Sequence, residues 1–187
     1  MFRAFIAIDL DLAHKQKISG LISDLKQANA DVKWANEGQL HITLKFLGNI
    51  GDIELEQVSG IIKDIAINTK TFAISLSGIS VFPDTHRPNV VWVGIDKGAD
   101  ILKFLVDKIG SRLESAGLKK EKREFRAHLT LGRAKSLKNI NYLTELIKKT
   151  DFRPTDKIEI KNIILFQSTL TPKGAVHTPL AKFKLSC

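Results

Sequence analysis

Two short segments of the chain repeat one pattern, and this repeat limits the folds that the chain can adopt. His41-Ile42-Thr43-Leu44 and His128-Leu129-Thr130-Leu131 each read histidine, apolar, threonine, apolar. Side chains alternate between the two faces of a strand, so each histidine shares a face with the threonine two places on, while the apolar residues point to a core. Each segment therefore predicts a half-buried strand that presents an imidazole and a hydroxyl together.

Strand and helix patterns alternate along the rest of the chain. Apolar residues spaced by three and four predict helices over roughly residues 11–30 and around Val58–Ile65, Leu102–Leu113 and Ile140–Ile147. Apolar and β-branched runs predict strands at Phe2–Ile8, Val32–Ala35, Leu40–Leu47, Thr71–Val81, Val90–Ile95, Arg126–Arg133, Ile158–Phe166 and Ala175–Leu185. Each His-Thr strand follows one predicted helix and precedes another, which indicates an α+β fold built by duplication. We expect a single domain over residues 1–187 with two pseudo-symmetric lobes.

Composition limits the compartment and the partners. Apolar residues make up 43% of the chain, which is enough for a substantial core. The single cysteine, Cys187, cannot form an internal disulfide, and this favours a cytoplasmic protein. The apolar run Met1–Ile8 is too short for a signal peptide or a membrane span, so we expect a buried strand there and no membrane association. A formal net charge of +9 favours a polyanionic partner without identifying it.

The paired histidines suit acid–base chemistry. Imidazole titrates near neutral pH, so one neutral ring can accept a proton from water while a protonated ring donates to a leaving oxygen. Threonine hydroxyls can bind the non-bridging oxygens of a phosphate. One histidine in an apolar strand is usually structural, but the repeat favours a functional pair. The other histidines have no such motif, and we expect them at the surface or in loops: His14, His86 and His177.

The spacing of the residues that could bind a metal does not indicate a metal site. The chain has neither a His-Glu-x-x-His nor a Cys-x-x-Cys segment, so we expect no metal and no cofactor. The basic segment Lys119–Arg126 leads directly into the second motif. It is either a solvated loop or a rim that attracts a phosphate backbone.

Two residues near the motifs are candidate substrate contacts. Arg133 lies five places after His128 and could contact a phosphate in bidentate fashion. Regular alternation places Arg133 on the face opposite His128 unless a twist redirects it. Phe46 lies five places after His41, and alternation likewise places it opposite that histidine. Aromatic rings could stack on a base, although Phe46, like Trp34 and Trp92, fits a core position better.

The chain also resembles a known family. The segments that carry the resemblance are Phe5–Ile8, Leu40–Gly48, Val90–Gly94, His128–Arg133 and Ser168–Gly174. They resemble the 2H phosphoesterase superfamily and, within it, the RNA 2′,3′-cyclic phosphodiesterases, also called 2′-5′ RNA ligase-like proteins. The resemblance covers essentially the whole chain. One departure is Ala127, which stands where many members have proline.

The resemblance implies a bilobal fold in which two antiparallel β-sheets line a central cleft, with helices on the outside. It implies hydrolysis of an RNA terminal 2′,3′-cyclic phosphate to a 2′-phosphate without a metal. By matched position, His41 is the proton donor and His128 the proton acceptor. The same match implies that four residues bind the substrate: Thr43, Thr130, Arg133 and Phe46.

The expected partner is therefore RNA with a 2′,3′-cyclic phosphate end, such as a tRNA fragment, bound by a monomer. Three alternatives stay open at this point. The same site could join or open a 2′-5′ linkage between RNA ends. It could instead act on a small cyclic nucleotide, or bind RNA ends without turnover.

Overall fold

The computed structural model describes residues 1–118, 124–172 and 174–187, and in these residues strands and helices alternate as the sequence predicts. The helices are α1 (Leu12–Leu25), α2 (Asp52–Ile67), α3 (Ala99–Ser115) and α4 (Ile140–Lys149), with short 3-10 turns η1 (Lys26–Ala28) and η2 (Glu37–Gln39). The strands are β1 (Phe2–Asp9), β2 (Val32–Trp34), β3 (His41–Ile50), β4 (Phe72–Ile74), β5 (Leu76–Phe82), β6 (Val90–Ile95), β7 (His128–Ala134), β8 (Ile158–Ile160), β9 (Asn162–Thr171) and β10 (Gly174–Lys184). Each motif therefore begins a strand, β3 or β7.

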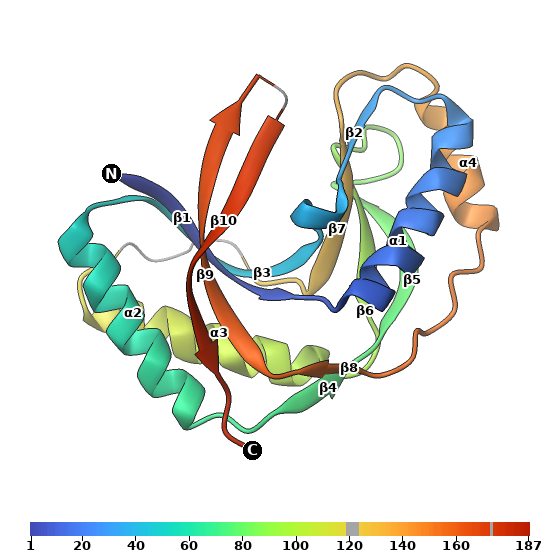
Figure 1. Ribbon diagram of the computed structural model, residues 1–187. Coiled ribbons are helices and arrows are strands. Elements are labelled where there is room, and N and C mark those ends of the chain that lie inside the picture. The colour runs from blue at the N-terminus through green and yellow to red at the C-terminus, as the bar shows by residue number, and fades with distance from the viewer. Residues whose placement is uncertain (119–123, 173) are drawn as a thin grey trace.

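Two four-stranded antiparallel sheets form the body of the protein. Sheet A has the order β10-β9-β1-β3 and sheet B the order β2-β7-β6-β5. Figure 1 shows them as the two arms of a V that converge where the motif strands β3 and β7 contact each other. Helices α2 and α3 pack against sheet A, while α4 packs on β5 of sheet B and α1 packs on α4. The predicted α+β fold with two duplicated sheets is confirmed.

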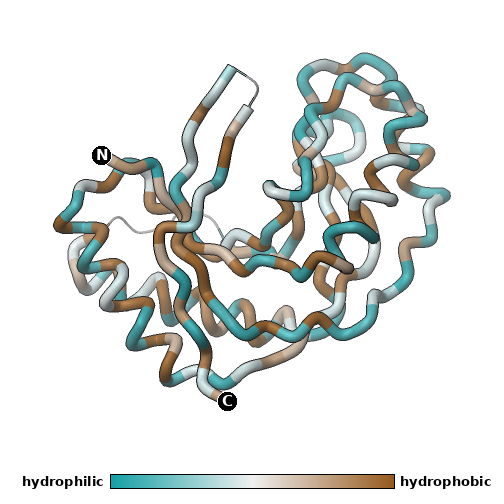
Figure 2. Tube along the Cα trace, viewed as in Figure 1, coloured by the Kyte–Doolittle hydropathy of each residue, from teal (hydrophilic) through white to brown (hydrophobic). Residues whose placement is uncertain are grey.

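The core forms where the apolar faces of the helices meet the sheets. In α1 the buried residues are Ile18, Leu21, Ile22 and Leu25, which are the positions that the helical spacing singles out. Figure 2 shows the same alternation of hydrophobic and hydrophilic positions along the helices and the central strands. Each fully buried Leu or Ile side chain contributes roughly 1.5–3 kcal/mol. These contacts hold the helices against the sheets or against one another, and they leave the opposite face of each sheet for the motifs.

Two predicted strands are each divided into two pieces. The run over 71–81 bends at Ser75, whose buried hydroxyl accepts a hydrogen bond from the Lys97 backbone N–H at 3.2 Å. The piece before Ser75 is β4, and it pairs with β8 in a separate two-stranded sheet. The run over 158–166 is divided in the same way at Lys161, so that β8 leaves sheet A and β9 remains in it. Strand alternation could not reveal this because both halves keep their apolar faces buried.

Two predicted boundaries also move. The helix expected over 11–30 ends at Leu25, and the turn after it finishes at Asn29 in the left-handed conformation, with φ of 50°. The strand expected from Arg126 starts at His128, because the residues just before the histidine have no strand partner in the described part of the chain. None of the helices in the described ranges is both long enough and apolar enough to cross a bilayer.

Candidate active site

Both motif strands show the expected alternation. The apolar residues Ile42 and Leu129 are fully buried, while the histidine and threonine of each motif lie half-buried on the other face. We call the faces that carry His41 and His128 the histidine faces of sheets A and B. Neither Thr43 nor Thr130 has a side-chain hydrogen bond within the described residues, so both hydroxyls are free to bind a ligand.

A β-bulge follows the threonine in each motif. In sheet A, Ala7 pairs with Thr43 but its neighbour Ile6 pairs with Lys45, which leaves Leu44 as an extra residue. In sheet B, Trp92 pairs with Thr130 and the preceding Val91 pairs with Gly132, which leaves Leu131 as the extra residue. One extra residue reverses the alternation beyond it. Phe46 and Arg133, five places after His41 and His128, therefore share the faces of these histidines, whereas a second extra residue in sheet A, Leu47, restores the alternation beyond it.

The bulges overturn the expected placement of Phe46 and Arg133. Phe46 pairs with Phe5, their ring centroids lie 6.1 Å apart, and the Phe46 side chain is 59% exposed, so Phe46 is not a core residue. Arg133 is exposed and lies close enough to His128 that its charge lowers the pKa of that ring. Both side chains thus lie on the histidine faces, contrary to regular alternation.

His128 is held by the backbone just before it. Its Nδ1 lies 2.6 Å from the Arg126 carbonyl oxygen, and because a carbonyl only accepts, Nδ1 must carry the proton. The Nε2 atom of the neutral ring therefore has a free lone pair. Phe82 meets the ring edge-on at 5.2 Å and in turn stacks on Trp92 at 4.7 Å. Burial lowers the pKa of His128, Arg133 lowers it further, and the Arg126 hydrogen bond opposes both.

His41 is more deeply buried than His128. The Gln39 backbone, again two places upstream, lies near its ring and favours the protonated form. The Phe5 ring lies 4.8 Å from the His41 ring. Burial above all, then the positive charges of His177 and Lys15, lower the pKa of His41 to about 3, while the Gln39 hydrogen bond opposes the shift. In the free protein His41 is therefore neutral at neutral pH.

The prediction that His177 lies at the surface or in a loop was wrong. This residue lies in β10, where its ring meets the His41 ring edge-on at a centroid distance of 5.1 Å. His14, by contrast, binds the helix-capping Asp11 carboxylate at 2.8 Å, and His86 lies in an exposed loop, as expected. The local sequence around His177 does predict a strand. It carries no information on which strand lies beside it, so this third histidine could not be found from the sequence.

The described residues contain no group of three or more His, Cys, Asp or Glu side chains that could hold a metal ion. Most of the basic segment that the sequence singled out, residues 119–123, lies outside the described residues. Its last member, Arg126, is described, and its guanidinium lies over the Phe82 ring at 5.9 Å.

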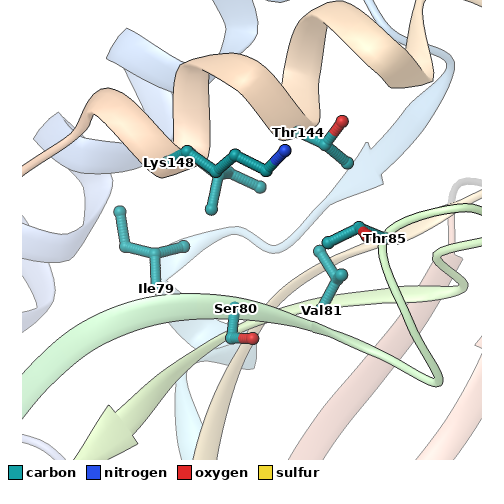
Figure 3. A pocket seen from close by; sticks show the side chains of 7 residues that line it. Ile79, Ser80, Val81, Thr85, Thr144 and Lys148 are labelled. Carbon is teal, nitrogen blue, oxygen red and sulfur yellow. The ribbon is translucent and has the colours of Figure 1, made fainter.

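A small pocket of about 120 Å³ lies away from the histidines, between β5 and α4. Figure 3 shows its lining, which comprises Ile79, Ser80, Val81, Thr85, Thr144, Ile147 and Lys148. The Thr144 hydroxyl already donates to the Asn141 carbonyl at 2.9 Å. With no acid–base pair and few free polar groups, this pocket is a gap in helix packing and not a second reaction site.

The comparison with family models decides the identity of the chain. The model described as LigT like phosphoesterase matches residues 8–92 and again residues 93–177, so that each match contains one His-Thr strand. The chain belongs to the LigT-like phosphoesterase family. The resemblance to the 2H phosphoesterases is thereby confirmed, and the chain is an enzyme of the hydrolase class.

Individual relatives agree with this membership. A Methanothermobacter thermautotrophicus protein named RNA 2′,3′-cyclic phosphodiesterase is 32% identical over 98% of each chain. A Methanocaldococcus jannaschii protein of the same name is 33% identical over 94% of this chain and 96% of the relative. Among solved structures, Escherichia coli LigT complexed with 3′-AMP aligns with a TM-score of 0.79 at 21% identity, covering 100% of this chain and 99% of LigT. At that identity the last likeness supports the fold alone.

Proposed function

We propose that this enzyme hydrolyses the terminal 2′,3′-cyclic phosphate of RNA to a 2′-phosphate, without a metal, by the paired action of His41 and His128. One observation carries the proposal. The two motifs are built alike, each with a histidine whose ring lies near the backbone two places upstream, a free threonine hydroxyl on the same face and a bulge beyond it. The curated relatives named RNA 2′,3′-cyclic phosphodiesterase support the choice of substrate.

In the proposed reaction water attacks phosphorus and the bond from phosphorus to the 3′-oxygen breaks. The free Nε2 lone pair of His128 takes the proton from the attacking water. A protonated His41 gives its proton to the departing 3′-oxygen, so that the product carries a 3′-hydroxyl and a 2′-phosphate. The attacking and leaving oxygens lie roughly in line at phosphorus, and one histidine from each sheet serves each of them.

The threonines and Arg133 bind the phosphate in this proposal. The free hydroxyls of Thr43 and Thr130 donate to its non-bridging oxygens. Arg133, exposed on the histidine face of sheet B, adds a charged contact to the phosphate or to the next one along the RNA. Phe46 offers an exposed ring on which a base can stack.

The deep burial of His41 makes its proton depend on the substrate. Lowering the pKa from 6.5 to about 3 corresponds to a cost of about 5 kcal/mol for the charged ring. A phosphate anion about 4 Å away contributes roughly 4 kcal/mol at the effective dielectric of a protein site. The bound phosphate therefore offsets most of the cost, so His41 carries a proton for the leaving oxygen mainly when the substrate is bound.

The test is turnover of a short RNA that ends in a 2′,3′-cyclic phosphate by the wild type, His41→Ala and His128→Ala. The proposal expects turnover by the wild type and a loss of two to four orders of magnitude in each variant, roughly the contribution of one acid or base. Near-full activity in either folded variant would show that the paired mechanism is wrong. That the RNA is a tRNA fragment, that the enzyme is a monomer of one domain and that it acts in the cytoplasm stay predictions from the sequence.

A further inference from the structure

His177 meets His41 in a defined arrangement. The two rings are nearly perpendicular, at 89°, with centroids 5.1 Å apart. Phe5 contacts both, at 4.8 Å from the His41 ring and 5.0 Å from the His177 ring. Aromatic rings in such edge contacts restrict each other's rotation. The orientation of the His41 ring is therefore restricted by its contacts with His177 and Phe5.

Gln39 links the surroundings of His41 to the strand that carries His177. Its backbone lies near the His41 ring, and its side-chain Nε2 donates to the Ala175 carbonyl oxygen at 2.6 Å. Ala175 lies two places before His177 on β10, and side chains two places apart share a face. At the turn of the same hairpin, a Cβ on Gly174 would lie 2.8 Å from Lys33 Nζ on β2 of sheet B. The Gln39 hydrogen bond fastens the β9–β10 hairpin beside His41, and the Lys33 side chain lies close to Gly174 at the turn.

The His177 ring is not occupied with a structural hydrogen bond. Its Nδ1 is buried and has no hydrogen-bond partner among the described residues, whereas Nδ1 of His14 binds Asp11 and Nδ1 of His128 binds Arg126. Buried polar atoms are nearly always satisfied, and the exceptions in native proteins occur often at functional sites. The unpaired nitrogen therefore favours a role for this imidazole beyond packing.

The remaining charges around His41 come from α1 and β1. Lys15 on α1 forms an ion pair with Asp9 at 2.6 Å, and Asp9 is the β1 residue that pairs with His41. The other side chains in ring contact, Phe5 and Phe166, are neutral. Because Asp9 balances much of the Lys15 charge, His177 is the group whose own titration can change the charge beside His41.

We propose that His177 is a positioning residue for His41, and that the two perpendicular imidazoles hold at most one positive charge between them. This inference rests on the proposed catalytic role of His41. As the pH falls, the less buried His177 takes up a proton first, and its charge then opposes a second proton on His41. Once His177 is charged, the pair opposes a proton on His41 more strongly than burial alone does, and the ring contact holds His41 in one orientation for proton transfer.

The experiment follows the histidine ring signals by NMR as a function of pH in the full-length wild type, His177→Phe and His177→Gln. Phenylalanine keeps an aromatic edge and glutamine keeps a polar group, but neither can become charged. We expect the titration midpoint of His41 to rise by about one pH unit or more in both variants, as expected for removing a neighbouring like charge. In the pH profile of kcat/KM on RNA with a cyclic phosphate end, the midpoint of the acid limb should move to higher pH in the same variants. Val176→Ala, an exposed position on the other face of β10, is the control for disturbing the hairpin.

An unchanged His41 midpoint in both variants would overturn the inference. A shift in only one of them would also overturn it, because packing and not charge would then be responsible. The NMR arm needs no turnover, so a wild type that is inactive on RNA but shows the shift would refute the proposed function and leave the coupled pair established.

Discussion

Burial of His41 makes the folded protein sensitive to acid, and the structure gives the size of the effect. The ring binds a proton near its ordinary pKa of 6.5 in the unfolded chain but only near pH 3 in the folded one. Protons therefore favour the unfolded chain between these values. Stability from this group is complete above pH 6.5 and is lost as the pH falls toward 3. At pH 4, about 2.5 pH units below 6.5, the loss is about 3 kcal/mol at roughly 1.36 kcal/mol per unit.

Urea unfolding at pH 8 and pH 4 measures this loss when the wild type is compared with His41→Asn. The free energy of unfolding of the wild type should fall by about 3 kcal/mol more than that of the variant between the two pH values. Carboxylates, His128 and His177 are present in both proteins, so their contributions largely cancel. His86→Asn, in an exposed loop, is the control for loss of a histidine elsewhere. An equal fall in wild type and His41→Asn would refute the reasoning from burial.

Further predictions concern activity and the second bulge. The kcat/KM of the wild type should follow a bell-shaped pH profile with its acid limb well below pH 6.5, because one imidazole must be charged and the other neutral; a flat profile between about pH 5 and 8 contradicts this. Arg133→Met should raise KM by about tenfold or more while urea unfolding stays within about 0.5 kcal/mol of the wild type, since the side chain is exposed. Gly132→Ala should lower the free energy of unfolding by about 1–3 kcal/mol, because its Cβ would lie 2.7 Å from Val32 Cγ1 and 2.9 Å from Trp34 Cε3. Gly110→Ala, where a Cβ meets nothing within 4 Å, is the matched control, and equal stability of the two variants would argue against close packing at the bulge.

The histidines and threonines could be predicted because strand alternation is a local property. His41 and Thr43 share a face for the same reason that Ile42 is buried, and a four-residue pattern is enough to show it. The helical faces could be predicted equally well, since the buried residues of α1 recur at the expected spacing.

The bulges could not be read from the sequence. Leu44 and Leu131 are the extra residues, but an apolar residue after threonine also fits a regular strand, and the residues that follow, Lys45 and Gly132, have nothing in common. A bulge is decided by pairing with the neighbouring strand, and its consequence is that the residues after it change face as far as the next bulge. This is why alternation placed Phe46 and Arg133 on the wrong side.

His177 illustrates the other limit. It lies beside His41 although β10 and β3 are opposite edges of sheet A, because Phe5 of β1 contacts both rings and Gln39 binds the hairpin. These are long-range pairings, and no periodicity within one strand specifies them. The sequence could therefore locate both halves of the proposed site but not the residue that packs against one of them.

The central claim is a metal-free hydrolysis that leaves the phosphate on the 2′-oxygen. The most direct measurement is the ³¹P NMR spectrum of the product after EDTA-treated wild type acts on a short RNA ending in a 2′,3′-cyclic phosphate. The account predicts complete conversion to the 2′-phosphate in the presence of EDTA, and none with the His41→Ala, His128→Ala double variant. A 3′-phosphate product, or activity that requires an added divalent cation, would contradict it.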